Sequence, residues 1–179
     1  MDLFVYNPTF SLAICRECQF AVVANEVTTH LNTRHRSLPA AERKKIAEAV
    51  QQCPGIMKSQ GNLALLQLPE PTTSPIKYLA PPQSDGLKCI TCTFVCRRLE
   101  VMQRHCRDDH GWKNDWKKGG DVKRKAAKAK NIAWVEGVSC QRFFPTRAGR
   151  RWFHQLHGKA LPLQIHTLQQ LPRQLRGHC

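Results

Sequence analysis

Apolar residues alternate with small or polar residues near the start of the chain. Phe10, Leu12 and Ile14 occupy every second position, and this period of two is typical of a β-strand. Over 26–35 the spacing changes to that of a helix, and Asn25 stands just before it in a position suited to an N-cap. The pattern therefore predicts a strand followed closely by a helix.

A second helix is expected soon after the first. Pro39 is suited to a first helical turn, and Ile46, Val50 and Cys53 recur at helical spacing. Pro54 ends this periodic run. We interpret Cys53 as a small apolar residue on the inner face of the helix.

The middle of the chain has a different pattern. Residues 55–86 are rich in proline and poor in charge, which favours an extended connector with at most a short strand at 76–79. Strand-like stretches return over 131–153, where two aromatic-rich segments flank the sequence PTRAG. This part of the chain predicts a small β element.

Cysteine and histidine add a pattern that occurs twice. Residues 15–35 read C-x2-C-x11-H-x4-H, and residues 89–110 read C-x2-C-x12-H-x4-H. Two residues between the cysteines let one turn aim both sulfurs at a single point, and histidines five apart lie on nearly the same face of a helix. The predicted ligands are Cys15, Cys18, His30 and His35 for one metal ion, and Cys89, Cys92, His105 and His110 for another.

This donor set favours zinc. Four protein ligands close a tetrahedron and leave no open position for a substrate, so we expect two structural zinc ions. Each motif also has an aromatic residue two positions after its second cysteine and an apolar residue three positions before its first histidine, as the core of a small ββα finger requires. These residues are Phe20 and Phe94, and Val27 and Met102. A pair of disulfides is the alternative interpretation.

The remaining cysteines leave two questions open. Cys106 is able to replace His105 and give a site of three cysteines and one histidine, although His105 matches the first histidine of the other motif. Cys140, His154 and His157 suggest a third site. One thiolate beside two histidines is more typical of ordinary packing and surface positions.

The formal net charge of +15 is concentrated in one half of the chain. Lys and Arg outnumber Asp and Glu by 9 to 7 over residues 1–90, and by 19 to 6 over residues 91–179. This asymmetry favours a polyanionic partner, with nucleic acid first and acidic proteins or an anionic membrane second. A solubilising tail that carries a nuclear import signal is the alternative.

Positive charge is densest just after the second motif, over 113–130. The run is similar to a bipartite nuclear import signal and equally suits contact with phosphate. The residues expected to contact phosphate here are Lys117, Lys118, Lys123, Arg124 and Lys125.

The helix of the second motif carries arginine where a DNA-reading finger contacts bases. The three positions that contact bases hold Arg98, Val101 and Arg104. Two neighbouring positions suited to phosphate contact hold Arg97 and Arg107. Arginine binds guanine O6 and N7 with two hydrogen bonds, so this helix suits base contact. The reading positions of the first motif hold Val23, Glu26 and Thr29, a poor set for bases or phosphate. We expect only the second motif to read DNA.

Composition argues against several other classes. An odd number of cysteines, nine, and an N-terminus without a basic region before an apolar run favour a reducing, intracellular compartment, and the basic run favours the nucleus. No stretch approaches the roughly 20 apolar residues of a membrane helix, so we expect no membrane partner. We expect neither an enzyme nor a small-molecule substrate, because no glycine-rich phosphate loop and no nucleophile–base group stands apart from the metal ligands.

The order of these blocks resembles a known family. LAICRECQFAV and HLNTRH, then DGLKCITCTFVC and MQRHCRDDH, then WVEGVSCQRFF and RRWF, are similar over roughly residues 5–155 to the fungal family named after the orsellinic acid biosynthesis cluster protein D. The resemblance implies a paired-finger domain of unknown biochemical activity, attached in some members to helicase-like or mobile-element proteins, and it supports the eight ligands above. The chain departs from the family pattern after Phe153, which suggests a shortened or rearranged copy.

Together these observations predict a small α+β, metal-stabilised fold with two separate ββα-like zinc fingers. The expected divisions are a first finger with its following helix (1–54), a proline-rich connector (55–86), a second finger (87–111), a basic linker (112–130), an aromatic β segment (131–158) and a mobile tail (159–179). The leading hypothesis is a zinc-binding accessory or regulatory factor that binds DNA. The alternative is a zinc-dependent scaffold that binds protein without reading DNA.

Overall fold

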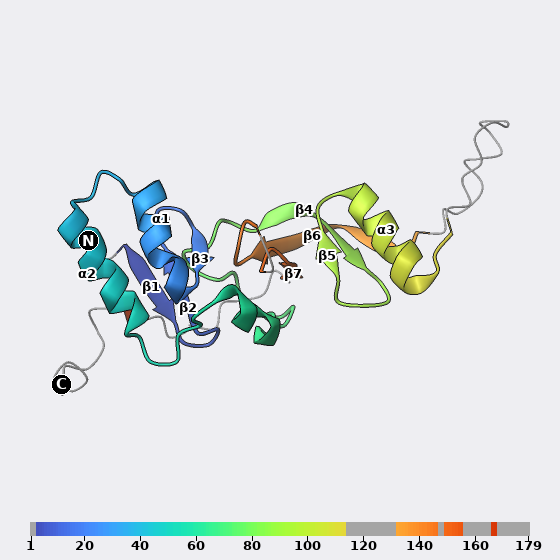
Figure 1. Ribbon diagram of the computed structural model, residues 1–179. Coiled ribbons are helices and arrows are strands. Elements are labelled where there is room, and N and C mark those ends of the chain that lie inside the picture. Colours follow the sequence, from blue (N-terminus) through green and yellow to red (C-terminus); the bar gives the residue numbers. More distant parts are fainter. Residues whose placement is uncertain (1–2, 114–131, 147–148, 156–165, 168–179) are drawn as a thin grey trace.

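The structure is a computed structural model that describes residues 3–113, 132–146, 149–155 and 166–167. Two units of strands and helices lie at opposite ends of the molecule (Figure 1). One contains the helices α1 and α2 with the strands β1 to β3, and the other contains α3 with β4 to β7. The prediction of a small α+β fold is confirmed at this level.

The first unit is built on an antiparallel sheet in the order β3-β2-β1-β8. Its strands are β1 (Phe4–Asn7), β2 (Leu12–Cys15), β3 (Phe20–Val22) and β8 (His166–Thr167). Strand β2 is the strand that the alternating pattern predicted. Strand β8 corrects the expectation of a mobile tail over 159–179, because it pairs with β1; the other tail residues lie outside the described residues.

Both helices of the first unit are present where the spacing predicted them. They are α1 (Val27–Arg34) and α2 (Ala40–Gln51), and Pro39 is the N-cap of α2. Asn25 does not cap α1, because it lies inside a short 3-10 helix, η1 (Ala24–Glu26), that precedes it. The Asn25 backbone N–H instead donates to the carbonyl of Lys58, 2.9 Å away, so a contact distant in sequence decides how this helix starts.

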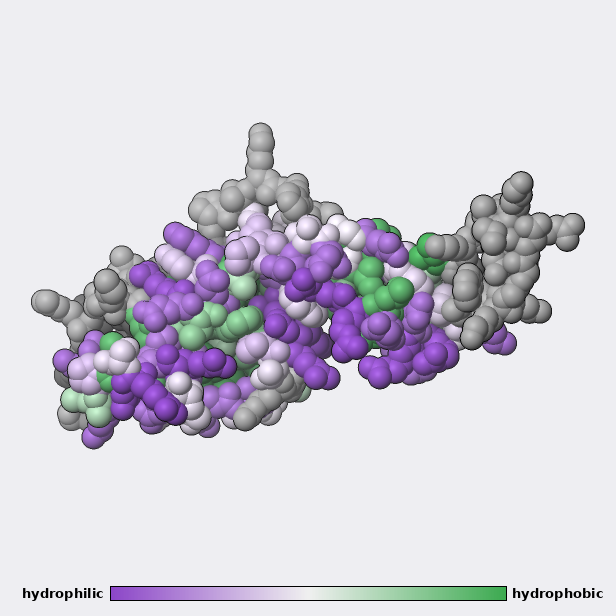
Figure 2. Space-filling model, turned by 90° about the horizontal axis from the view of Figure 1, so that it is seen from above, coloured by the Kyte–Doolittle hydropathy of each residue, from purple (hydrophilic) through white to green (hydrophobic). Residues whose placement is uncertain are grey.

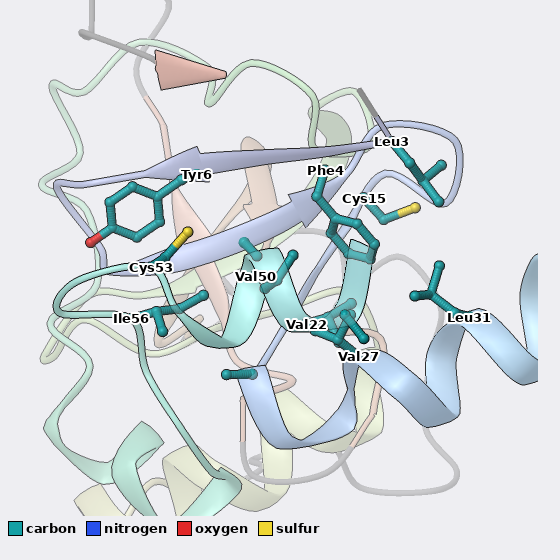
Figure 3. Close-up of a cluster of buried hydrophobic side chains, with 13 residues drawn as sticks. Leu3, Phe4, Tyr6, Cys15, Val22, Val27, Leu31, Val50, Cys53 and Ile56 are labelled. Atoms are coloured by element: carbon teal, nitrogen blue, oxygen red, sulfur yellow. The ribbon is translucent and has the colours of Figure 1, made fainter. Parts of the chain in front are cut away.

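One face of the first sheet packs against these two helices. Figure 3 shows side chains of β1 and β2 meeting those of α1 and α2 in a continuous core. The core also contains Cys53, which is 2% exposed and confirms its interpretation as a small apolar residue. Cys15 of the first motif belongs to this core and Cys18 packs against it, so the core holds part of the motif in place.

The proline-rich segment is not the extended connector that the sequence predicted. It contains a short 3-10 helix, η2 (Gln60–Leu65), and no strand at 76–79, where the chain turns. Leu63, Ile76 and Leu79 are at most 4% exposed, so the segment is part of the core. The buried side chain of Gln141 holds it: Gln141 accepts from the Ile76 N–H at 2.9 Å and donates to the Ala80 carbonyl at 2.8 Å.

The second unit is a small closed barrel with one helix. Its strands pair in the order β4-β5-β7-β6, and β6 also pairs with β4. The elements are β4 (Gln83–Cys89), β5 (Val95–Cys96), α3 (Leu99–His110), β6 (Trp134–Arg142) and β7 (Trp152–His154). Gly86 lies where β4 shifts register against β6, and a Cβ there would meet the Val138 carbonyl at 2.5 Å. Strands β6 and β7 are the β element predicted over 131–153.

A shared core joins the two units. Phe143, Phe144 and Phe153, which follow or belong to β6 and β7, pack with Leu12 and Ile14 of the first sheet. The proline-rich segment completes this core. The two metal-ligand motifs therefore lie in different units, but the units are not the separate fingers that the sequence predicted.

In the described part of the chain, no helix is long and apolar enough to cross a bilayer.

Candidate metal centres

The first cluster forms where β2 and α1 meet. Cys15 ends β2, Cys18 lies in the turn before β3, His30 lies within α1, and His35 follows its last turn. The four donor atoms all lie within 4.8 Å of one another. Cys15 and His35 are buried, whereas Cys18 and His30 are half-buried.

The second cluster has the same plan. Cys89 ends β4, Cys92 lies in the turn before β5, and His105 and His110 both belong to α3. Their donor atoms also lie within 4.8 Å of one another. The Phe94 ring stacks on His105 with 4.0 Å between centroids, so the aromatic residue predicted after the second cysteine fixes a ligand ring. Met102, predicted as a core residue, is 0% exposed.

The spacing of the donors fits a tetrahedral metal ion. A zinc ion about 2.05 Å from two imidazole nitrogens places them about 3.3 Å apart, and one sulfur at about 2.3 Å lies about 3.5 Å from each nitrogen. In the first cluster His30 Nε2 and His35 Nε2 are 3.3 Å apart, and Cys15 Sγ is 3.3 Å from His35 Nε2. In the second cluster Cys92 Sγ is 3.2 Å from His105 Nε2 and 3.4 Å from His110 Nε2. Both sites can therefore hold a metal ion.

In each cluster, a carboxylate lies close to the Nδ1 atom of one histidine. Glu17 Oε2 lies 3.1 Å from His35 Nδ1, and Asp109 Oδ2 lies 2.5 Å from His105 Nδ1. A carboxylate at Nδ1 keeps the proton on that nitrogen and leaves Nε2 free to bind metal. The two acids occupy different places in their motifs, one between the cysteines and one on the helix. The same chemical arrangement thus arises from two different local sequences.

The thiols of the two clusters differ in acidity. Burial raises the pKa of Cys15 to about 12. Burial also opposes ionisation of Cys89, but the backbone N–H groups of Thr91 and Cys92 and the His105 side chain outweigh it and lower its pKa to about 6. Burial, followed by the charge of His35, lowers the pKa of His30 to about 4, so this imidazole is neutral and able to bind metal.

Cys106 lies beside the second cluster but is not one of its four candidate metal ligands. It is 0% exposed, and its Sγ lies 3.7 Å from Met102 Sδ and 3.9 Å from the Ala133 carbonyl oxygen. The geometry therefore favours His105 as the ligand. Cys140 faces His154 across β6 and β7, but the described residues form no third cluster of metal donors, and His157 lies outside them.

The arginines predicted to contact DNA have different surroundings. Arg98 and Arg107 form exposed ion pairs with Glu100 and Asp108, and Arg104 is exposed on α3. Arg97 donates two hydrogen bonds to Asp85, at 2.5 and 2.7 Å. The five predicted residues of the basic run, from Lys117 to Lys125, lie outside the described residues.

The contacts of Glu17 and Asp109 with the ligand histidines were not predicted from the sequence. Asp109 stands four residues after His105, a spacing at which helical side chains meet, so the sequence contained a signal for this contact. Glu17 lies inside the turn between Cys15 and Cys18, where nothing in the spacing indicates that its carboxylate reaches His35.

Comparison with known proteins gives one match. A family model described as Orsellinic acid/F9775 biosynthesis cluster protein D matches residues 2–111, more than half of the chain, and includes all eight predicted ligands. No curated protein and no solved structure matches the chain.

Proposed function

We propose that this member of the Orsellinic acid/F9775 biosynthesis cluster protein D family binds zinc and that its second unit binds DNA. Each site is a ββα-like zinc finger set into a larger sheet. The ions are structural, the protein is not an enzyme and takes no small-molecule substrate, and its place of action is the nucleus. A protein partner is compatible with this function.

The donor chemistry supports zinc. Two thiolates and two imidazoles at tetrahedral spacing are the ligands that zinc prefers in structural sites, and they leave no coordination position open. The small hydrophobic core around the second cluster includes the ligands Cys89 and Cys92 together with residues such as Met102 and Trp134. Metal binding and folding of this unit are therefore coupled.

The proposal of DNA binding rests on one observation: Arg98 and Arg104 are exposed on, or next to, a helix that the second cluster anchors. The first unit supports this division of roles, because Val23 is 0% exposed and is therefore hidden from a DNA partner. A single finger reads only about three base pairs, so further phosphate contacts are needed for stable binding.

Changing Arg98 and Arg104 together to alanine is expected to remove sequence preference. Each arginine that binds a guanine contributes about 1 to 3 kcal/mol of discrimination. The measurement is selection of duplexes from a random pool by the zinc-loaded protein at about 150 mM salt. A guanine-containing motif that the double variant loses supports the proposal. Equal enrichment by both proteins, or none by either, contradicts sequence-specific reading by α3.

Removing the carboxylate behind His105 is expected to weaken zinc binding. Asp109→Ala should lower the affinity of the second site about tenfold, the low end of the usual effect of such partners, because Asp109 is 61% exposed. Titration of the protein against a zinc chelator measures this affinity. The matched control is Asp108→Ala, which removes the neighbouring acid but not the contact with His105. Equal affinities in the two variants would show that Asp109 has no role in binding.

A protein-binding scaffold is the second candidate, and one feature favours it. Ile90 is 60% exposed and Val135 is 50% exposed, close to where β4 and β6 pair beside the second cluster. Exposed apolar side chains of this kind are common at protein interfaces. Co-purification of a protein partner, together with the absence of binding to random duplex DNA, would favour this function over the first.

A further inference from the structure

Four cationic side chains lie against two aromatic rings, those of Trp152 and Tyr78. The guanidinium carbons of Arg97 and Arg142 lie 5.2 and 4.7 Å from the centre of the Trp152 ring. The Arg16 guanidinium carbon and the Lys77 Nζ lie 4.8 and 5.0 Å from the centre of the Tyr78 ring. We call Arg16, Lys77, Arg97 and Arg142 the junction cations.

These two rings flank the same short stretch of chain. Arg142 also lies over Phe20, with its guanidinium carbon 5.6 Å from the ring centre. The Ala80 N–H, two residues after Tyr78, donates to the Gln19 carbonyl at 2.9 Å. Both ring sites are thus next to residues 16–20, the turn that carries Cys18. Figure 2 shows hydrophilic residues between the two apolar areas of this view.

The rings hold these cations without neutralising them. Among the described residues, Asp85 is the single carboxylate that pairs with any of the four, and it pairs with Arg97. The nearby Glu17 pairs with His35 instead. A carboxylate cancels the charge of an arginine, whereas an aromatic face attracts the cation and leaves its charge in place. The junction therefore keeps a net positive charge.

Arg142 has one paired and one unpaired donor nitrogen, since a terminal nitrogen donates to the Pro145 carbonyl at 3.2 Å. Burial lowers its pKa, and the nearby charge of Arg97 lowers it further. Its Nε is buried without a hydrogen-bond partner among the described residues, as is the Nε of Arg16. The positive charges of Arg97 and Arg142 repel each other, and an anion bound near them would offset this repulsion and accept the unused hydrogen bond of the Arg142 Nε.

We propose that the junction cations bind the phosphate backbone of nucleic acid. This proposal rests on the proposed DNA binding and adds to it a contact that does not depend on base sequence. Phosphate suits the site because guanidinium binds it with paired hydrogen bonds. The aromatic faces already carry the cations, so the rings position these groups rather than stack on bases. The junction supplies the phosphate contacts that a single reading helix lacks.

The test uses the full zinc-loaded chain and a labelled random-sequence duplex, with affinity measured by fluorescence anisotropy over a series of salt concentrations. Arg142→Gln and Lys77→Gln should each weaken binding about threefold to tenfold at about 150 mM salt and reduce the salt slope by about 0.9. Lys44→Gln is the matched control, because Lys44 is an 80% exposed lysine on α2, away from the junction. It should bind like the unchanged protein. Thermal unfolding of Arg142→Gln checks that the variant remains folded.

The outcomes separate this inference from the proposed function. If Lys77→Gln and Arg142→Gln bind like Lys44→Gln while the Arg98 and Arg104 double variant loses affinity, the junction does not contact phosphate, but DNA binding stands. A weaker affinity with an unchanged salt slope also overturns the inference, because the loss is then not electrostatic. If the unchanged protein binds no nucleic acid at this salt, both proposals fail.

Discussion

Replacing Cys89 with serine is expected to release one of the two zinc ions and to unfold the second unit. The core around this cluster is small and packs the ligand Cys89 with residues such as Met102 and Trp134. Structural zinc contributes on the order of 10 kcal/mol to the folding of a finger, more than so small a core supplies. Zinc per chain should fall from about two to about one.

Two measurements check this expectation. Metal content of the purified variant gives the stoichiometry. The near-UV circular dichroism spectrum should lose the signal of the Trp112 and Trp134 pair, whose ring centroids lie 5.2 Å apart. Cys53→Ser is the control, since Cys53 is a buried thiol of the first unit that belongs to neither group of metal ligands. Unchanged zinc content in Cys89→Ser would show that the ligand assignment is wrong.

Cys106→Ala decides between the two ligand sets for the second site. With His105 as the ligand, this variant keeps both ions, whereas a three-cysteine site loses one. If His105 is the ligand, His105→Ala should lose one ion. If Cys106 is the ligand, His105→Ala should keep both.

Phe143→Ala is expected to destabilise the whole molecule by about 3 to 5 kcal/mol, the usual cost of removing a buried ring. Phe143 is 0% exposed, and its ring lies 4.9 Å from Phe10 and 5.1 Å from Phe153. Its backbone carbonyl also accepts from the Ala21 N–H at 2.8 Å. The residue therefore links the first sheet to the strands of the second unit, and its loss should weaken the contact between them.

Thermal or chemical unfolding of the zinc-loaded protein measures this effect. Most domains have a free energy of unfolding of about 5–15 kcal/mol, so the variant should be close to the limit of stability. Leu65→Ala is the matched control, because Leu65 is 79% exposed and its removal should change stability by less than about 0.5 kcal/mol. If Phe143→Ala lowers the free energy of unfolding by no more than Leu65→Ala does, the two units fold independently and the shared core contributes little to stability.

The metal clusters are the part of the site that the sequence predicted best. The eight predicted ligands come together in two groups, and Val27 and Met102 are both fully buried as expected. These features are local: a short turn aims two cysteines, and helical periodicity aims two histidines. The carboxylate of Glu17 was not foreseen, because its contact with His35 spans 18 residues and depends on how the first unit folds.

The fold was predicted less completely, and the errors share one cause. The aromatic-rich segments of 131–153 predict strands, but they do not show which strand is the neighbour of each. The pairing of β6 with β4 joins residues about 50 positions apart, and the proline-rich segment became part of a core because Gln141 satisfies its backbone groups.

The sequence by itself determined the metal-ligand motifs, the two helices of the first unit and the uneven charge, since each depends on residues close together in the chain. Only the tertiary structure decided that the units carrying the two motifs share one core and that Arg97 and Arg142 both lie against the Trp152 ring. The burial of apolar surface is non-directional, so it does not by itself specify which apolar residues pack together. Those packing partners are fixed only in the close-packed interior of the complete fold.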